Sequence, residues 1–213
     1  MCRLVLATRN PGKVEEMRAI LRLGGLGSVK VLSSADFPGL GDVEENGETF
    51  EENAKKKALA VAEATGEVTV ADDSGLEVDV LGGAPGVRSA RFAGEAIPRG
   101  ESRDKANREK LLLLLKGVPG PARTARFRCV VAVASPGGRV RTTEGVCEGR
   151  IILAPRGSGG FGYDPVFVPD GYDKTFAELG PEVKNEISHR ARALRAAIAA
   201  IREQLGLPAA GGF

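Results

Sequence analysis

Two adjacent aspartates, Asp72 and Asp73, follow a short apolar run and constrain this chain more than any other feature. The run, Val68–Ala71, has the residue types of a buried β-strand, and Ser74 and Gly75 come directly after the carboxylates. Neighbouring carboxylates repel each other, so they favour a partner that offsets their charge, and carboxylate oxygens suit Mg²⁺. The alternative is an Asp-Ser-Gly turn in which the side chains cap backbone N–H groups. This stretch alone leaves both interpretations open.

Length, composition and net charge exclude several classes of protein. A chain of 213 residues makes one large domain or two small lobes, and 42% hydrophobic with 27% charged residues is typical of a globular protein. A net charge of +2 predicts no nucleic-acid or membrane partner, although a basic site for a small anion remains possible. Three cysteines without C-x-x-C spacing indicate reduced thiols, and no apolar run is long enough for a signal peptide or a membrane span. We therefore expect a cytoplasmic protein.

The first strand leads into a sequence that favours phosphate. A strand is expected at residues 4–7, and the segment Thr8–Lys13 follows it. Asn10 is a good N-cap and Pro11 suits the first helical position, so a helix is predicted from here to Leu23. A helix N-terminus presents N–H groups and a partial positive charge, which favour an anion. The alternative is an ordinary capped helix with a solvated lysine.

An acidic loop and a second helix come next. Glu45 closes the loop, where it is either solvated or a second carboxylate for the cation that Asp73 would bind. The capping box Thr49–Glu52 begins a helix that runs to about Ala64. Lys57 projects beside the apolar stripe of this helix and reaches water unless a groove lies there.

The middle of the chain predicts more sheet. A helix is expected at residues 101–116, ending in five leucines that face a core or a partner subunit. Strands are expected at residues 125–134 and 139–153, as an antiparallel extension of the sheet.

Two further segments carry aromatic and basic side chains. The loop at residues 157–165 holds four glycines in six residues, together with Phe161, whose ring either fills the core or stacks on a flat ligand for ~1–3 kcal/mol. Asp164 is placed to accept from N–H donors of such a ligand. His189 and Arg190 begin a C-terminal helix; they are structural, or they donate to a carbonyl or phosphate.

These pieces form an ordered series of six motifs: Thr8-x-Asn10-x-x-Lys13, Glu44-Glu45-x-Gly47-x-Thr49-Phe50, Asp72-Asp73-Ser74-Gly75-Leu76, Gly82-Gly-Ala-Pro-Gly86, Phe161-Gly-Tyr-Asp-Pro165 and Ser188-His-Arg190. The series resembles the noncanonical purine nucleoside triphosphate pyrophosphatases, also called inosine/xanthosine triphosphatases, from Leu4 to about Leu205. The resemblance implies an α/β fold whose elongated mixed β-sheet is flanked by helices forming two lobes, with a central substrate groove. Residues 1–207 would be one two-lobed domain, and residues 208–213 a disordered tail.

The resemblance also implies roles for single residues. Asp73 would be the general base, and Glu45 and Asp73 would bind Mg²⁺. Arg9 stands where a small residue is common, so it points outwards or adds a phosphate contact; Glu48 and the lysine run at residues 55–57 also depart from the usual pattern. The substrate-binding residues would be Thr8, Arg9, Asn10, Pro11, Gly12 and Lys13 at the triphosphate, Lys57, Ser74 and Lys184 along the substrate, and Phe161, Gly162, Tyr163, Asp164, His189 and Arg190 around the base.

The activity implied is hydrolysis of ITP, dITP and XTP to the monophosphate and pyrophosphate by a homodimer, which cleanses the nucleotide pool. Donors at His189 and Arg190 would match the C6 carbonyl of hypoxanthine or xanthine and would be left unpaired by the amino group of adenine. Two alternatives remain: a pyrophosphatase for pyrimidine or other modified nucleotides, and a nucleotide-binding protein without turnover.

Overall fold

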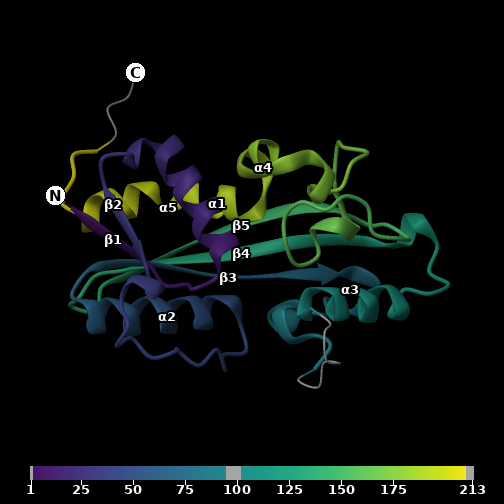
Figure 1. The fold of residues 1–213 in the computed structure, drawn as a ribbon, viewed down its shortest axis with the longest axis horizontal. Coiled ribbons are helices and arrows are strands. Elements are labelled where there is room, and N and C mark those ends of the chain that lie inside the picture. The colour runs from purple at the N-terminus through teal and green to yellow at the C-terminus, as the bar shows by residue number, and fades with distance from the viewer. Residues whose placement is uncertain (1, 95–101, 210–213) are drawn as a thin grey trace. The chain divides into compact units, whose positions relative to one another are not determined.

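The computed structural model describes residues 2–94 and 102–209, and a six-stranded sheet runs through them (Figure 1). The strand order is β2-β1-β3-β4-β5-β6. β1 pairs in parallel with both β2 and β3, whereas β5 and β6 are antiparallel, so the sheet is mixed, as the resemblance implies. The strands are β1 Arg3–Leu6, β2 Lys30–Ser33, β3 Val68–Val78, β4 Thr124–Ala134, β5 Val140–Ile151 and β6 Phe167–Pro169.

Helices flank this sheet, which makes the fold α/β as predicted. They are α1 Pro11–Leu21, α2 Phe50–Thr65, α3 Arg103–Leu114, α4 Phe176–Ile187 and α5 His189–Gln204. The predicted N-caps at Asn10 and Thr49 are confirmed, because both side chains accept a backbone N–H of the first turn. Glu101, the expected start of α3, and residues 210–213 of the expected tail lie outside the described residues.

The prediction that the strand after Val68 ends at the two aspartates is wrong. β3 continues through Asp72, Asp73, Ser74 and Gly75 to Val78. Because successive side chains of an extended strand point to opposite faces of a sheet, the two carboxylates leave the backbone in opposite directions. The repulsion that adjacent carboxylates suggest is therefore relieved first by the backbone, and each carboxylate meets a different set of partners.

The chain divides into two compact units. The first comprises residues up to Asp73, Cys129–Gly145 and residues from His189 onward. In it α2 covers one face of the strands, and α1 and α5 cover the other (Figure 1). Its core includes the fully buried side chains of Leu4, Leu6, Met17, Ile20, Val70, Val131, Leu194 and Ile201.

The second unit comprises Ser74–Arg128 and Val146–Ser188. Its core contains a cluster of three aromatic rings, in which Phe167 lies 4.7 Å from Phe127 and 5.3 Å from Phe176 between ring centroids. Two leucines of the leucine run, Leu111 and Leu115, are buried in this core. The run therefore serves the core in part, and the exposed members of the run are Leu113 and Leu114.

Two findings complete the fold. α4 was not predicted, although Thr175 and Glu178 form a capping box at its start, because Gly180 and Pro181 interrupt the helical pattern. Among the described residues, no helix has both the length and the apolar character that a bilayer crossing requires.

Candidate active site

The start of α1 brings a polar segment to the end of β1. Asn10 caps the helix by accepting the N–H of Lys13 at 3.2 Å, and Thr8 Oγ1 accepts the N–H of Asn10 at 3.2 Å. The cap thus uses one of the N–H groups that we expected to face an anion. Pro11 has no N–H to offer, so attraction for an anion depends largely on the Lys13 ammonium.

Asp72 ties α1 and α5 to β3. Lys13 Nζ lies 3.0 Å from Asp72 Oδ2 and donates to Oδ1 at 3.1 Å. Arg190 donates to Oδ2 from Nε at 3.1 Å and from Nη2 at 2.9 Å, and its Nη1 donates to Glu16. Arg190 is 1% exposed and Asp72 2% exposed, so this network is buried. Burial by itself would raise the pKa of Asp72, but Lys13, Arg190 and Lys57 hold that pKa well below its usual range.

Asp73 points to the opposite face, towards α2. Asn53 donates to Asp73 Oδ2 at 3.0 Å, and Lys57 Nζ lies 3.8 Å from Oδ1. Lys57 also donates to Glu45 Oε1 at 2.9 Å and to the backbone carbonyl of Asp72 at 2.7 Å. Asn53 and Lys57 are four residues apart on α2 and project together. One helix face therefore holds both carboxylates that were expected to bind a cation.

Electrostatics distinguish the two aspartates. Burial, followed by the charge of Glu45, raises the pKa of Asp73 despite the nearby Lys57. Burial would lower the pKa of Lys57, but Asp72, Asp73 and Glu45 together raise it. A carboxylate with a raised pKa is a stronger base, whereas the lowered pKa of Asp72 keeps that group ionised.

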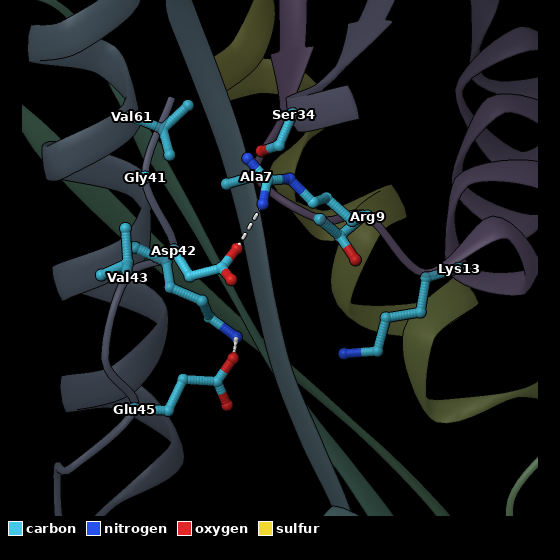
Figure 2. Close-up of a pocket in the computed structure, with 11 residues that line it drawn as sticks. Ala7, Arg9, Lys13, Ser34, Gly41, Asp42, Val43, Glu45 and Val61 are labelled. Carbon is cyan, nitrogen blue, oxygen red and sulfur yellow. Dashed lines mark hydrogen bonds and ion pairs between the residues drawn. The ribbon is translucent and has the colours of Figure 1, made fainter. Parts of the chain in front are cut away.

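A pocket of about 220 Å³ opens beside these residues. It is small compared with the ~300–1,000 Å³ of drug-sized ligand pockets, and this size suits phosphate groups better than a whole nucleotide. Figure 2 shows Lys13 and Glu45 extending into the same space from α1 and from the loop before α2. The lining residues are Ala7, Thr8, Arg9, Lys13, Ser34, Gly41, Asp42, Val43, Glu45, Lys57 and Val61.

Arg9 ties the acidic loop to the end of β1. Its Nη1 donates to Asp42 Oδ1 at 2.6 Å, and its Nη2 donates to the carbonyl of Leu40 (Figure 2). The side chain is 43% exposed, so it reaches solvent while it lines the pocket.

The donor set fits a hard divalent cation. Glu45 and Asp73 offer carboxylate oxygens at 2.9 Å and 3.8 Å from one ammonium, Lys57 Nζ, and oxygen is the ligand atom that Mg²⁺ prefers. Within the residues that the structure describes, no group of three or more His, Cys, Asp or Glu side chains is arranged around a metal position. Two carboxylates are the protein ligands that Mg²⁺ takes when substrate phosphates and water complete its shell.

The second unit gathers the remaining predicted residues. Asp164 Oδ2 accepts from Lys184 Nζ at 2.5 Å and from the N–H of Phe161 at 2.9 Å. Lys184 Nζ also lies 4.4 Å from the centroid of the Phe161 ring. Tyr163 donates its hydroxyl to the carbonyl of Ser89 at 2.8 Å, and burial raises its pKa well above the usual value. Phe161–Asp164 and Lys184 therefore form one cluster, in which Phe161 is partly exposed.

The other predicted residues lie as follows. Ser74 is half-buried in β3, as the first residue of the second unit. His189 is the first residue of α5 and is 4% exposed. Asn10, Pro11 and Gly12 form the start of α1 and do not line the pocket.

Sequence reasoning missed two contributors to the site and the partner of a third. Asn53 and Glu16 had signals, because they share helix faces with Lys57 and Lys13, at spacings of four and three residues. Asp72 was seen as half of a pair, but its partner Arg190 is 118 residues away in sequence. No local pattern reveals such a contact.

The fold and the site together define an α/β protein with a carboxylate and lysine site suited to a phosphate group and a divalent cation. The Ham1 family profile matches residues 4–200, and the chain belongs to the Ham1 family.

Known relatives agree with this assignment. A protein named dITP/XTP pyrophosphatase from Desulforamulus reducens is 58% identical over 196 residues, which cover 92% of this chain and 94% of the relative. Another of that name from Bacillus subtilis is 52% identical over 191 residues, covering 90% and 92%. The solved structure of a HAM1 protein from Coxiella burnetii aligns with a TM-score of 0.81 at 40% identity, covering 95% of this chain and 100% of that one. The resemblance read from the six motifs is confirmed.

Proposed function

We propose that this chain is a nucleoside triphosphate pyrophosphatase that hydrolyses dITP, ITP and XTP to the monophosphate and pyrophosphate. The observation that carries the proposal is the arrangement of Glu45 and Asp73 around Lys57, next to a small pocket that Lys13 also lines. The names of the curated relatives, dITP/XTP pyrophosphatase, support the choice of substrate.

Several side chains of this protein have separate roles in the proposed reaction. Asp73 accepts the proton of a water molecule that attacks the α-phosphorus, and pyrophosphate leaves. Asn53 holds one oxygen of Asp73 and so fixes the direction of the carboxylate. Lys13 and Lys57 place positive charge at the phosphate oxygens, where charge develops in the transition state. Mg²⁺ held by Glu45 and Asp73 would, when bound, neutralise phosphate charge and lower the pKa of a coordinated water.

We assign stacking on the base to the second unit. The ring of Phe161 stacks on the purine, and Asp164 with Lys184 supplies an acceptor and a donor beside it. Arg190 takes a different role from the one expected from sequence, because its Nε, Nη1 and Nη2 donate to Asp72 and Glu16. We assign Arg190 to positioning of Asp72 and α1, and we retain His189 as a candidate contact for the base.

The test is a substrate panel with the full-length protein. Pyrophosphate and orthophosphate release would be measured for ITP, dITP, XTP, GTP, ATP and UTP, with Mg²⁺ and with EDTA. We expect pyrophosphate from ITP, dITP and XTP, little from ATP, and no turnover in EDTA. Orthophosphate would contradict attack at the α-phosphorus, preference for UTP would favour a pyrimidine nucleotide pyrophosphatase, and no turnover of any nucleotide would favour a binding protein.

A matched pair of variants tests the base. Asp73→Asn should lower kcat for ITP by about 10²–10⁴-fold, the contribution of a general base, while nucleotide binding measured by calorimetry persists. The control is Glu63→Gln, which neutralises an exposed carboxylate of α2 and should leave kcat unchanged. A rate for Asp73→Asn near that of the control would remove Asp73 from the mechanism.

Three broader expectations complete the proposal. We propose that residues 1–207 act as one pyrophosphatase domain and that the protein is a homodimer, which the exposed side chains of Leu113 and Leu114 support. We also propose a cytoplasmic location, supported by three cysteines that are all free thiols. Light scattering of the purified protein measures the oligomeric state.

A further inference from the structure

The peptide backbone of Gly162 is held from both sides by α3. The N–H of Gly162 donates to Asp104 Oδ2 at 2.7 Å, and its carbonyl accepts from Arg108 Nη1 at 2.7 Å. Asp104 and Arg108 are four residues apart on a helix, so they project from one face. Both bonds are partly buried and involve a charged side chain, which makes them stronger than bonds between neutral groups. One helix face therefore holds a single loop residue through its donor and its acceptor.

The loop residue held by α3 is next to an aromatic residue in the chain. Gly162 directly follows Phe161 and has a φ of 60°, in the left-handed region that glycine adopts without strain. The N–H of Phe161 donates to Asp164 Oδ2, and its ring lies beside Lys184. A displacement of Gly162 would therefore move both the ring and the hydrogen bonds of the Asp164 carboxylate.

α3 is itself anchored in the core of the second unit. Leu111 and Leu115, at its end, are fully buried in the core of the second unit. Asn107 is 3% exposed, accepts the N–H of Ala93 at 2.7 Å and donates to the carbonyl of Ala90 at 3.1 Å. Asp104 and Arg108, the two side chains that clamp the backbone of Gly162, thus extend from a helix whose own position is fixed by packing.

We infer that Asp104 and Arg108 are positioning residues for base recognition, which hold the Phe161 ring where it stacks on a purine. The inference rests on the proposed function, and it deepens that function by adding a determinant of substrate binding. Neither residue needs to touch substrate, because both act on the backbone of Gly162.

The experiment separates the base from the phosphates. Arg108→Met removes the donor to the Gly162 carbonyl, and Asp104→Ala removes the acceptor for its N–H. KM and kcat for ITP would be measured together with the Ki of inorganic triphosphate, a probe that carries phosphates and no base. Lys105→Met and Glu109→Gln are matched controls, because these neighbours on α3 lie 56% and 57% exposed in a surface pair.

We expect KM for ITP to rise about tenfold in both variants, the factor that one charge-assisted hydrogen bond is worth, with the Ki of inorganic triphosphate unchanged. Asp104→Asn keeps an acceptor oxygen and should restore KM to within about twofold of wild type. A variant that only loses folded protein would show a lower kcat and an unchanged KM. An unchanged KM would therefore overturn the inference, and so would a parallel rise of KM for ITP and Ki for inorganic triphosphate.

Two variants act on the backbone of the same residue, so the test survives the failure of one to fold. If Arg108→Met does not fold, Asp104→Ala and its rescue by Asp104→Asn decide the outcome. Wild-type protein that does not turn over ITP would overturn the proposed function, and this inference with it. Active variants with unchanged KM would overturn the inference alone.

Discussion

The buried network at Asp72 makes a quantitative prediction about stability. Asp72→Asn removes a negative charge that lies 3.0 Å from Lys13 and 2.9 Å from Arg190. At ~3 Å and an effective dielectric of about 20, each pair has a gross attraction of about 5 kcal/mol. Part of that attraction is offset by the cost of burying Asp72, and breaking a buried pair costs about 3–5 kcal/mol net. The loss of stability comes mainly from Arg190, because this side chain is 2% exposed and has little access to water when its partner is removed.

Thermal unfolding measures this loss. For a chain of this size 1 kcal/mol shifts Tm by about 2–4 °C, so Asp72→Asn should lower Tm by about 6–20 °C. The scan uses protein without nucleotide or metal, because ligands raise Tm by binding the folded state. Glu109→Gln breaks an exposed pair and is the control, with an expected cost of no more than about 1 kcal/mol. A Tm for Asp72→Asn equal to that of the control would refute the argument.

A double variant tests the cause of the loss. Asp72→Leu alone leaves Arg190 without its carboxylate partner in β3, whereas Asp72→Leu with Arg190→Met replaces both charges with apolar groups. Replacing a whole buried pair is often neutral, so the double variant should be more stable than Asp72→Leu alone. Lys13 is 19% exposed and can turn to water in both. A double variant less stable than Asp72→Leu would show that the other contacts of Arg190, its packing and its bond to Glu16, outweigh the relief of its unpaired charge.

Further predictions concern backbone space, thiols and capping. Gly145→Ala should lower Tm, because a Cβ there would lie 2.2 Å from a backbone carbonyl oxygen of α5, whereas Gly137→Ala meets open space and should leave Tm unchanged. Burial raises the pKa of the Cys129 thiol to about 12, so a thiol reagent should modify the partly exposed Cys2 and spare Cys129 until the protein unfolds. Mass spectrometry of the labelled chain measures this, and a reaction of Cys129 in the folded state would contradict the prediction. Thr49→Ala removes the cap of α2 and should cost about 1 kcal/mol, measured by denaturant unfolding, and no change in stability would show that the cap is dispensable.

Local chemistry explains what could be predicted from the sequence. Asn10 and Thr49 were identified as helix caps because a capping side chain bonds to a residue only three positions ahead. The loop of Glu45 and the helix of Lys57 are adjacent in sequence, so a contact between them could be predicted from the sequence spacing. These features depend on short stretches of chain, and their residues determine them.

Other features depend on contacts that spacing does not encode. Ser74 and Gly75 have turn chemistry, yet they lie in the middle of an 11-residue strand, because tertiary context overrides local preference. α4 was missed because Gly180 and Pro181 break the sequence pattern of a helix, although a capping box begins it. The clamp on Gly162 joins segments more than 50 residues apart.

The alternation of β3 explains why two adjacent aspartates have different roles. Asp72 points to the side of α1 and α5, where Lys13 and Arg190 keep it ionised and fully engaged. Asp73 points to the side of α2, where burial makes it more basic and Asn53 fixes its direction. A single residue inserted before Asp72 would exchange these faces, because the side-chain period of a strand is two. The first carboxylate can therefore anchor the helix that carries Lys13, while the second remains available for proton transfer.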